Sequence, residues 1–342
     1  MNKMYYKSSY GSALVVVLWI IGLMSLLVTS MIFDANVEAR ITSYYRRRIR
    51  AEYLSNSGVE IAQFLMQKSV GLKKIEESED QDKWWFTGAQ KLAEGLAVRG
   101  MNKPLGVGNI ILDIVPEPAR RNVNTLTLED WERVLEVAGV PEEMWPELIE
   151  SVLDWIDQDN NKREDGAETD DYYATLDPPR RAKNGPLDTV GELLLVKGFS
   201  EPILYGGTIG ADENGEGGIS VSGIGDLLTT YGDGRVNVNA ASKRILMTLP
   251  DVDDLVAGAI IEEREGRERE GAEPEDNSFE NVNDFMSRIQ ELNPSLRRHV
   301  TTDSMIFRIK SVGDVRGVRR EVWCIVKYVQ QALTILQWRE ED

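Results

Sequence analysis

The hydrophobic pattern is dominated by one long apolar run near the N-terminus. No charged side chain occurs from Ser8 to Phe33, and residues 13–33 are nearly all apolar. A helix of about 20 apolar residues crosses the roughly 30 Å hydrocarbon layer of a membrane. A cleavable secretory signal has a shorter apolar core, about 7 to 15 residues, followed by a small-x-small site, which "VTSMIFDA" does not offer. The run therefore predicts one membrane-spanning helix.

Beyond Asp34 the pattern becomes amphipathic but keeps a helical period. Apolar residues recur at near-helical spacing at Val37, Ile41, Tyr44, Ile49, Tyr53, Val59, Ile61, Phe64 and Leu65. No proline interrupts this segment, and Gly58 is tolerable within a helix. The pattern predicts one continuous helix over about residues 13–68, roughly 80 Å long, half in lipid and half amphipathic.

The rest of the chain reads as strands on either side of a helical block. "NIILDIV" (109–115) predicts a strand, and "MIFRIK", "REVWCIVKYV" and "ALTILQW" predict strands near the C-terminus. Between them, Thr127 and Asp130 form a potential capping pair for "LEDWERVLEVAG", and Pro141 suits the first turn of the next helix. One apolar stripe follows at Trp145, Leu148, Ile149, Val152, Leu153 and Ile156.

Shorter helices are predicted in "TVGELLLVKG", "SKRILMTLP", "DDLVAGAIIEERE" and "NVNDFMSRIQEL". This order of elements predicts an α+β fold in which one sheet contains an inserted helical block, from about residue 121 to 300.

The charge distribution and the cysteine content limit the cellular compartments and the binding partners that the sequence allows. The chain has 39 basic and 57 acidic residues, a net charge of −18, which repels nucleic acid and anionic lipid. Lys3 and Lys7 precede the span and favour a cytoplasmic N-terminus, whereas the arginines at 46–48 and 50 argue mildly the other way from farther away. We therefore expect the large part outside the cytoplasm. Cys324 is the single cysteine, so no internal disulfide forms.

The sequence offers little for catalysis that depends on histidine. His299 is the single histidine, so any Ser-His-Asp or His-metal site would depend on it alone. Paired carboxylates of the glycosidase type stay open by residue counting, because the chain is so acidic. The sequence predicts a non-enzymatic protein, with a membrane-tethered hydrolase as the minor alternative.

An acidic loop, "DQDNNKREDGAE" (157–168), has the oxygen spacing of a calcium site. Counting Asp157 as position 1, side-chain oxygens fall at the EF-hand positions 1, 3, 5, 9 and 12, namely Asp157, Asp159, Asn161, Asp165 and Glu168, and Arg163 supplies the backbone carbonyl at position 7. Lys162 stands where the EF-hand turn has glycine, so this is not an ordinary EF-hand. Asp170 and Asp171 are candidates for a second ion. A solvated acidic loop is the alternative interpretation.

The N-terminal order of basic leader, glycine and uninterrupted apolar helix resembles the leader of type IV prepilins and type II secretion pseudopilins. The resemblance implies that a prepilin peptidase cuts between Gly11 and Ser12 and methylates the new N-terminus. In most family members the fifth mature residue is glutamate, but here it is Val16. A carboxylate in lipid is costly unless paired, so a subunit without a neighbour above it can lack one. An ordinary anchor with a chance glycine stays open on these residues alone.

The whole chain resembles minor pseudopilin K of type II secretion systems, most specifically in "DWIDQDNNKREDGAETDDYY", "KNGPLDTVGELLLVKG" and "RVNVNAASKRILMTLPDVDD". The resemblance implies a pilin-like α/β core with a large all-α insertion, and structural calcium in the acidic loop. The expected organisation is a leader (1–11), a transmembrane and stalk helix (12–70), a pilin-like core (71–120 plus 301–342) and an inserted helical domain (121–300).

The resemblance also implies a place and partners. The protein is expected in the inner membrane as a single-pass subunit, with its large domain periplasmic, at the tip of the pseudopilus, where it initiates or caps assembly for export across the outer membrane. Expected partners are minor pseudopilins of the I and J type, the major pseudopilin, the prepilin peptidase and the inner-membrane platform.

Two other functions are considered. A minor pilin of a type IV pilus would share the leader but need not carry the inserted block. "NVNAASKRILMTLPDVDDLVAGAIIEER" also resembles a helix-hairpin-helix, a unit that can hold DNA phosphates. The hairpin from Pro250 to Asp254 is acidic and lacks glycine, so a packing role is favoured over DNA binding.

Overall fold

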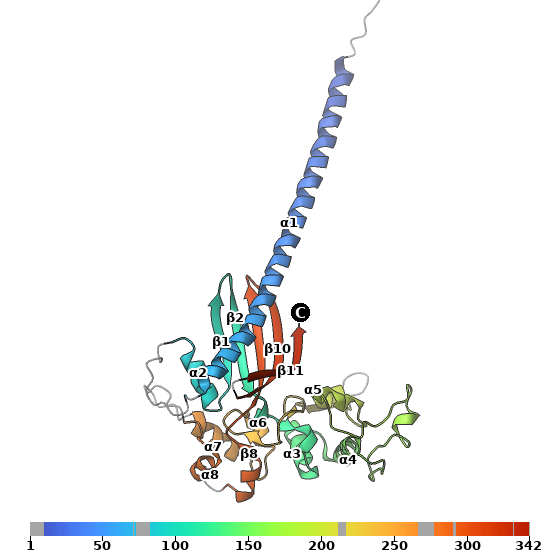
Figure 1. The fold of residues 1–342 in the computed structure, drawn as a ribbon. Coiled ribbons are helices and arrows are strands. Elements are labelled where there is room, and N and C mark those ends of the chain that lie inside the picture. Colours follow the sequence, from blue (N-terminus) through green and yellow to red (C-terminus); the bar gives the residue numbers. More distant parts are fainter. Residues whose placement is uncertain are drawn as a thin grey trace, which may run out of the picture.

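The computed structural model describes residues 10–70, 72, 83–210, 217–265, 277–289, 292–330 and 332–341. Its dominant element is α1 (Tyr10–Ser69), 60 residues without interruption, which confirms the predicted continuous helix. Figure 1 shows the N-terminal half of α1 standing free of the rest of the molecule and the C-terminal half lying against a sheet. Among the described residues α1 is the one helix long and apolar enough to cross a membrane.

One antiparallel sheet forms the platform under α1. Its strands are β1 (Val98–Leu105), β2 (Gly108–Pro116), β9 (Ile306–Val315), β10 (Val318–Val329) and β11 (Ala332–Glu341), in the order β1-β2-β9-β10-β11. Every neighbouring pair is antiparallel. The strand at 109–115 and the three C-terminal strands are therefore as predicted, whereas β1 was not predicted from the sequence.

The sheet core depends on a close approach of helix and strands. Alternate residues of β9, including Phe307 and Ile309, are buried against the C-terminal half of α1. At the crossing point, a Cβ on Gly58 of α1 would lie 2.8 Å from the Cβ of Ser311 on β9. Gly58 is therefore required by packing, because any side chain there would push the helix off the sheet.

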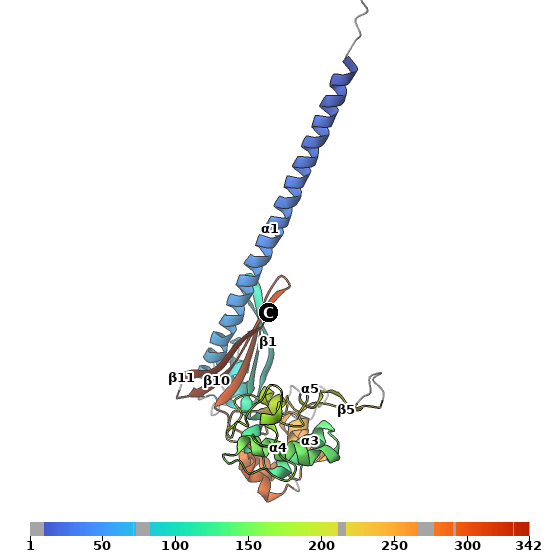
Figure 2. The same ribbon diagram turned by 90° about the vertical axis from the view of Figure 1, so that its right-hand side faces the viewer.

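The inserted region lies between β2 and β9, at the end of the sheet far from the free half of α1 (Figures 1 and 2). Its helices are α3 (Leu128–Ala138), α4 (Trp145–Ile156), α5 (Glu201–Tyr205), α6 (Lys243–Leu246), α7 (Asp254–Glu265) and α8 (Val282–Arg288), while the short α2 (Phe86–Ala93) precedes β1. Short 3-10 helices occupy Glu117–Ala119, Val123–Thr125, Glu142–Met144, Tyr173–Thr175, Val190–Leu195 and Pro294–Arg298.

Helices are the main regular elements of the insertion, but it is not all-α as the resemblance implied. It contains three two-stranded pairings: β3 (Arg121–Asn122) with β6 (Leu228–Thr229), β4 (Gly207–Ile209) with β5 (Ile219–Val221), and β7 (Val236–Asn237) with β8 (Val300–Thr301). Each strand has two or three residues, too few for a period-2 pattern to show in the sequence.

Local sequence features explain the helix boundaries. Thr127 and Asp130 form the predicted capping box at the start of α3, and Gly139 ends that helix with φ of 75°. Pro141 precedes a 3-10 turn instead of lying in the first turn of α4; that position belongs to Pro146.

Sheet and insertion have separate hydrophobic cores that are joined by buried polar contacts. The carboxylate of Glu117 is fully buried and accepts hydrogen bonds from Arg308 of β9, at 2.7 and 3.0 Å, and from the hydroxyl of Thr229 in the insertion, at 2.6 Å. Asn237 and Asn239 donate to the carbonyls of Gly95 and Glu94, at 3.1 and 2.9 Å. These contacts fix the insertion at one end of the sheet.

Candidate functional site

The first candidate site is the N-terminal end of α1. The helix begins at Tyr10, so Gly11 and Ser12 both lie within its first turn, while residues 1–9 of the expected leader lie outside the described residues. Val16 is 56 % exposed and belongs to a continuous exposed apolar surface that extends to Phe33. Surface of this extent is found where lipid or another protein replaces water. Cleavage after Gly11 stays a prediction.

The second candidate site is the acidic loop after α4. Asp154, in the last turn of α4, is fully buried and organises the loop. Its carboxylate accepts from the backbone N–H groups of Arg163, at 3.2 Å, and Ala167, at 3.0 Å, and pairs with the Arg163 guanidinium. A Cβ on Gly166 would clash with the same carboxylate. The loop is thus folded around Asp154, which the sequence prediction did not include.

The predicted ligands are distributed around this loop instead of converging. Arg163 also pairs with Asp157 at 2.7 Å, and its backbone carbonyl, the predicted ligand, accepts from the N–H of Gly166 at 3.3 Å. Lys162 pairs with Asp171 at 3.2 Å. The two basic side chains of the loop therefore already neutralise carboxylates that a cation would need.

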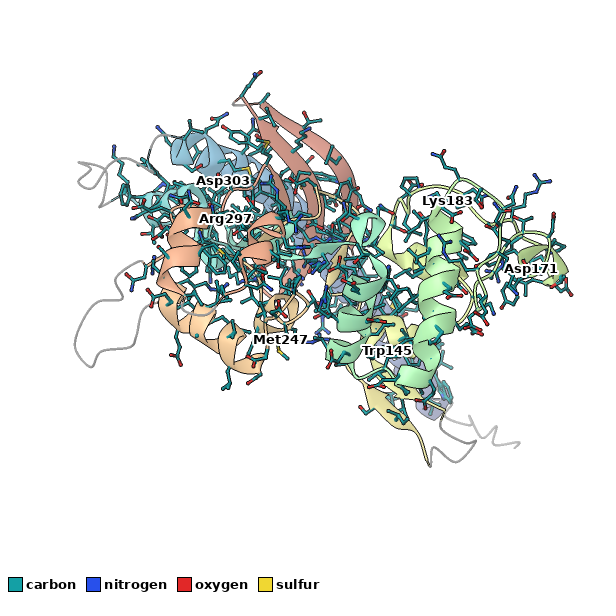
Figure 3. The ribbon with its side chains drawn as sticks, turned by 90° about the horizontal axis from the view of Figure 1, so that it is seen from below. Trp145, Asp171, Lys183, Met247, Arg297 and Asp303 are labelled. Carbon is teal, nitrogen blue, oxygen red and sulfur yellow. The ribbon has the colours of Figure 1, made fainter. Side chains whose placement is uncertain are left out.

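The other predicted ligands have local roles. Asp159 accepts from the N–H of Asn161 at 2.8 Å, and the N–H of Asp165 donates to Glu150 at 2.6 Å. Asp170 is exposed. Among the described residues no group of three or more His, Cys, Asp or Glu side chains is placed to hold a metal ion. Figure 3 shows Asp171 at the outer edge of the insertion, in the lobe that also carries Trp145 and Lys183.

Three buried oxygens in this region nevertheless lack a donor within the described structure: Oδ1 of Asp157, Oε1 of Glu168 and Oδ1 of Asn184. Burial raises the pKa of Glu168, and the nearby carboxylates of Asp154 and Asp157 raise it further. Glu168 and Asn184 line one cavity of about 910 Å³. Buried acceptors without a donor, close to other negative charges, are groups that a bound cation can satisfy.

Asn184 was also missed as a candidate ligand. It adopts a positive φ of 49° and donates to the carbonyl of Asp159 at 2.7 Å, which brings the distant segment "KNGPLD" against the acidic loop. Only the resemblance drew attention to this segment, since an asparagine 25 residues from its partner has no spacing that could reveal the contact.

The architecture defines the class of the protein. A single helix, long and apolar enough to span a membrane, continues without a break as the packing helix of an antiparallel sheet, and an insertion built around several helices enlarges the end of the sheet away from the free half of that helix. The architecture is pilin-like, and the comparisons with known proteins indicate which proteins it resembles.

Residues 111–205 match the family model described as type II secretion system (T2SS), protein K. A putative type II secretion system protein K from Escherichia coli K12 is 26% identical over 199 residues, which cover 56% of this chain and 59% of that protein. Type II secretion system protein K from Pseudomonas aeruginosa PAO1 is 28% identical over 178 residues, covering 51% and 44%. The chain thus matches roughly half the length of its curated relatives.

A solved structure extends the likeness over nearly the whole fold. A chain of the GspK-GspI-GspJ complex from the type 2 secretion system of enterotoxigenic E. coli superposes with a TM-score of 0.57, covering 89% of this chain and 99% of that chain at 17% sequence identity. The chain is therefore similar in sequence to type II secretion system protein K over roughly half of its length, and similar in fold to one chain of the GspK-GspI-GspJ complex, in agreement with the sequence resemblance.

Proposed function

We propose that this chain is a minor pseudopilin of a type II secretion system, a structural subunit at the tip of the pseudopilus, where it initiates or caps assembly for protein export across the outer membrane. The observation that carries the proposal is the position of the insertion. It projects from the end of the sheet opposite the membrane span, where a subunit stacked above would have to pass. Val16, apolar at the fifth mature position, is consistent with a subunit that has no such neighbour.

The proposed partners follow from the similarity to a chain of a solved complex. The similar solved chain belongs to a complex of three proteins, and we propose that this chain likewise joins I-type and J-type minor pseudopilins through α1. The major pseudopilin, the inner-membrane platform and the prepilin peptidase are its further proposed partners. The chain would lie in the inner membrane with its N-terminus cytoplasmic and its sheet and insertion periplasmic.

The intact mass of the full chain, produced with and without its cognate prepilin peptidase, tests the proposal first. A mature chain that starts at N-methylated Ser12 only in the presence of the peptidase is the expected result. A chain that still starts at Met1 in both samples would leave a simple membrane anchor and refute processing after Gly11.

Placement at the tip has its own test. Limiting the amount of this chain in cells that assemble pseudopili should reduce the number of filaments but not their length, because a tip subunit acts once per filament. A fall in length at constant number would contradict placement at the tip.

We further propose that the acidic loop holds structural Ca²⁺. Asp157, Glu168 and Asn184, the residues with donor-free buried oxygens, would hold the ion, and Asp159 and Asp165 lie in the same loop. Bound calcium would offset the repulsion among Asp154, Asp157 and Glu168 and so stabilise the packing of the loop on α4. Nothing in this role requires a reaction at the ion.

A further inference from the structure

The five-stranded sheet has two edges, and they differ in how they are protected. Among the described residues, the order β1-β2-β9-β10-β11 leaves β1 and β11 with a neighbouring strand on one side only. An edge strand presents unpaired backbone N–H and C=O groups, and natural proteins protect such edges with charges, prolines, bulges or covering elements. These features therefore indicate which of the two edges can accept another chain.

The β1 edge carries several protective features. Lys103 and Pro104 lie within the strand, so it offers a charge and a residue without an N–H group. Gly100 has a φ of 61°, at the point where the pairing with β2 shifts register. An added strand would meet charge, irregular backbone and a missing donor at this edge.

The β11 edge has neither charge nor proline over its first seven residues. Residues 332–338, "ALTILQW", are all uncharged, and we call them the open edge. The pairing with β10 shifts by one residue at Leu336, which is a bulge between Ile335 and Gln337. Figure 1 shows β11 at the margin of the sheet, directed toward the free half of α1.

The apolar face of the sheet is incomplete at the open edge. Ile335 lies opposite Val326 of β10, and Trp338 lies opposite Cys324, on the face of the sheet that packs on α1. Val326 and Cys324 are fully buried, whereas Ile335 is 50 % exposed and Trp338 is 39 % exposed. One further strand would extend this face and cover both side chains.

The opposite face of the open edge is polar and has basic neighbours. Gln337 accepts a hydrogen bond from the hydroxyl of Tyr231 in the insertion at 3.4 Å, and Thr334 lies opposite the exposed Lys327. Arg339 follows on the same face, just beyond the open edge. This face therefore favours polar or acidic neighbours, although the chain as a whole carries −18.

Geometry excludes two kinds of occupant. Two identical edges pair about a two-fold axis perpendicular to the strands, which makes the paired strands antiparallel. The same rotation would point the α1 of a second copy the opposite way, so the two apolar halves could not enter one membrane. A helix does not fit either, because its backbone N–H and C=O groups bond within the helix and would leave those of β11 unpaired.

We propose that the open edge binds an extended segment of a protein that has no anchor in this membrane, as a sixth, antiparallel strand beside β11. The segment would be apolar at the alternate positions that cover Ile335 and Trp338. At the positions between, next to Thr334 and Arg339, it would be polar or acidic. Seven residues at about 3.3 Å each give a contact of roughly 23 Å, in which main-chain hydrogen bonds provide affinity and alternate side chains provide selectivity.

The inference goes beyond the proposed function but rests on one part of it, the periplasmic position of the sheet. Exported proteins that lack an anchor would meet the open edge there.

A synthetic peptide of this chemistry tests the site. The probe is acetyl-VEVTVEV-amide with a fluorescent label, and fluorescence anisotropy follows its binding to the detergent-solubilised full chain. The peptide EVVTVVE has the same composition without the alternation, and it should bind at least tenfold more weakly. Equal binding of the two peptides would contradict a strand that is apolar on one face.

Backbone methylation of the probe distinguishes strand addition from hydrophobic contact alone. In an added strand, the N–H groups of every second residue point to β11 and the others point away. Methylation of one alternate set of nitrogens should therefore abolish binding, whereas methylation of the other set should change it less than about threefold. The same result for both sets, whether binding is lost or kept, overturns the proposal.

Substitutions at the two edges locate the binding site. Ile335→Lys places a protective charge on the open edge and should weaken peptide binding about tenfold. Leu105→Lys makes the same change in charge at the β1 edge, where Leu105 is 44 % exposed, and should leave binding unchanged. Ile335→Thr, uncharged and β-branched, should bind within about threefold of wild type. Wild-type binding by Ile335→Lys, or equal weakening by Leu105→Lys, places the peptide elsewhere and overturns the proposal.

Failure of the open edge and failure of the proposed function give different results. The complex with I-type and J-type companions should bind the peptide within about threefold of the chain alone. Loss of binding in the complex means that a companion covers the open edge, which overturns the proposal and leaves the role as a filament subunit intact. If no companion co-purifies with the wild-type chain, the proposed function fails, whereas peptide binding by the chain alone is measured independently.

Discussion

The fully buried carboxylate of Glu117 offers the most direct test of how sheet and insertion are joined. Arg308→Ala removes the two hydrogen bonds, at 2.7 and 3.0 Å, that β9 donates to this carboxylate. Thr229, at 2.6 Å, and Arg120, at 3.4 Å, would be its remaining partners. We expect Arg308→Ala to destabilise the protein far more than an ordinary surface substitution.

The magnitude follows from burial. Removing one partner of a buried ion pair costs about 3–5 kcal/mol, because the other charge is left without compensation. Arg308 is 32 % exposed, whereas Glu117 is 0 % exposed, so water can partly replace the guanidinium, and we expect the lower end, about 3 kcal/mol. The double variant Glu117→Leu, Arg308→Met should recover most of this loss, because no buried charge remains.

Urea unfolding of the detergent-solubilised full chain, followed by tryptophan fluorescence, measures the effect. Trp131 reports on the core of the insertion and Trp85 on the core of the sheet, so single-tryptophan versions show whether the two cores still unfold together. Arg319→Ala is the matched control: this arginine is 68 % exposed and pairs with Asp314 on the surface, so its loss should cost less than about 1 kcal/mol. An Arg308→Ala effect no larger than that of the control, with coincident transitions, would refute the reasoning.

Three further predictions concern other contacts. Burial alone would raise the pKa of Asp130, but Arg121, 2.6 Å away, lowers this pKa below its ordinary value. The resulting stabilisation is complete above the unfolded pKa of about 3.9 and is lost as the pH falls through the folded pKa. The urea midpoint should therefore drop at acidic pH less steeply in Asp130→Asn than in wild type. Gly58→Ala should cost about 1–3 kcal/mol through overpacking against Ser311, and Ser311→Gly in the same chain should restore the melting temperature; a Gly58→Ala chain as stable as wild type would contradict the close approach. Removal of Ca²⁺ with a chelator should lower the melting temperature of the wild-type chain, by an amount equivalent to about 2.7 kcal/mol if the ion was at a hundredfold excess over its Kd. The chelator should have little effect on the melting temperature of Glu168→Gln. Equal wild-type melting temperatures with and without chelator would refute the calcium proposal.

Much of the fold was predictable because its determinants are local. The course of α1 follows from an apolar run and a helical period that continues past Asp34, and the capping box of Thr127 and Asp130 marks the start of α3. By contrast, β1 (Val98–Leu105) has no regular alternation and contains a register shift, so its sequence does not read as a strand. Gly58 looked merely tolerable, since the Ser311 side chain that makes it necessary is 253 positions away (311 − 58).

The candidate site shows where spacing arguments fail. The oxygen spacing from Asp157 to Glu168 is that of a calcium loop, but spacing says nothing about which side chains turn inward. In the structure Arg163 forms ion pairs with the carboxylates of Asp154 and Asp157. The buried oxygens without a donor include Oδ1 of Asn184, which comes from a different segment. A sequence can display candidate ligands, but long-range packing decides which of them face one another.

The point at which the insertion leaves the sheet has a topological consequence. Pro116 at the end of β2 lies opposite Phe307 at the start of β9, so the chain departs and returns at adjacent positions of two paired strands. Without residues 117–305 the five strands form a plain meander in chain order, and a tight turn could close β2 onto β9. Loop-closure entropy grows only slowly with length, by about 0.6 kcal/mol for each doubling, and the insertion holds its own ends together through its own core. The connection between β2 and β9 should therefore accept inserted modules of very different size. Exchange of such a module would leave the packing of α1 on the five strands unchanged.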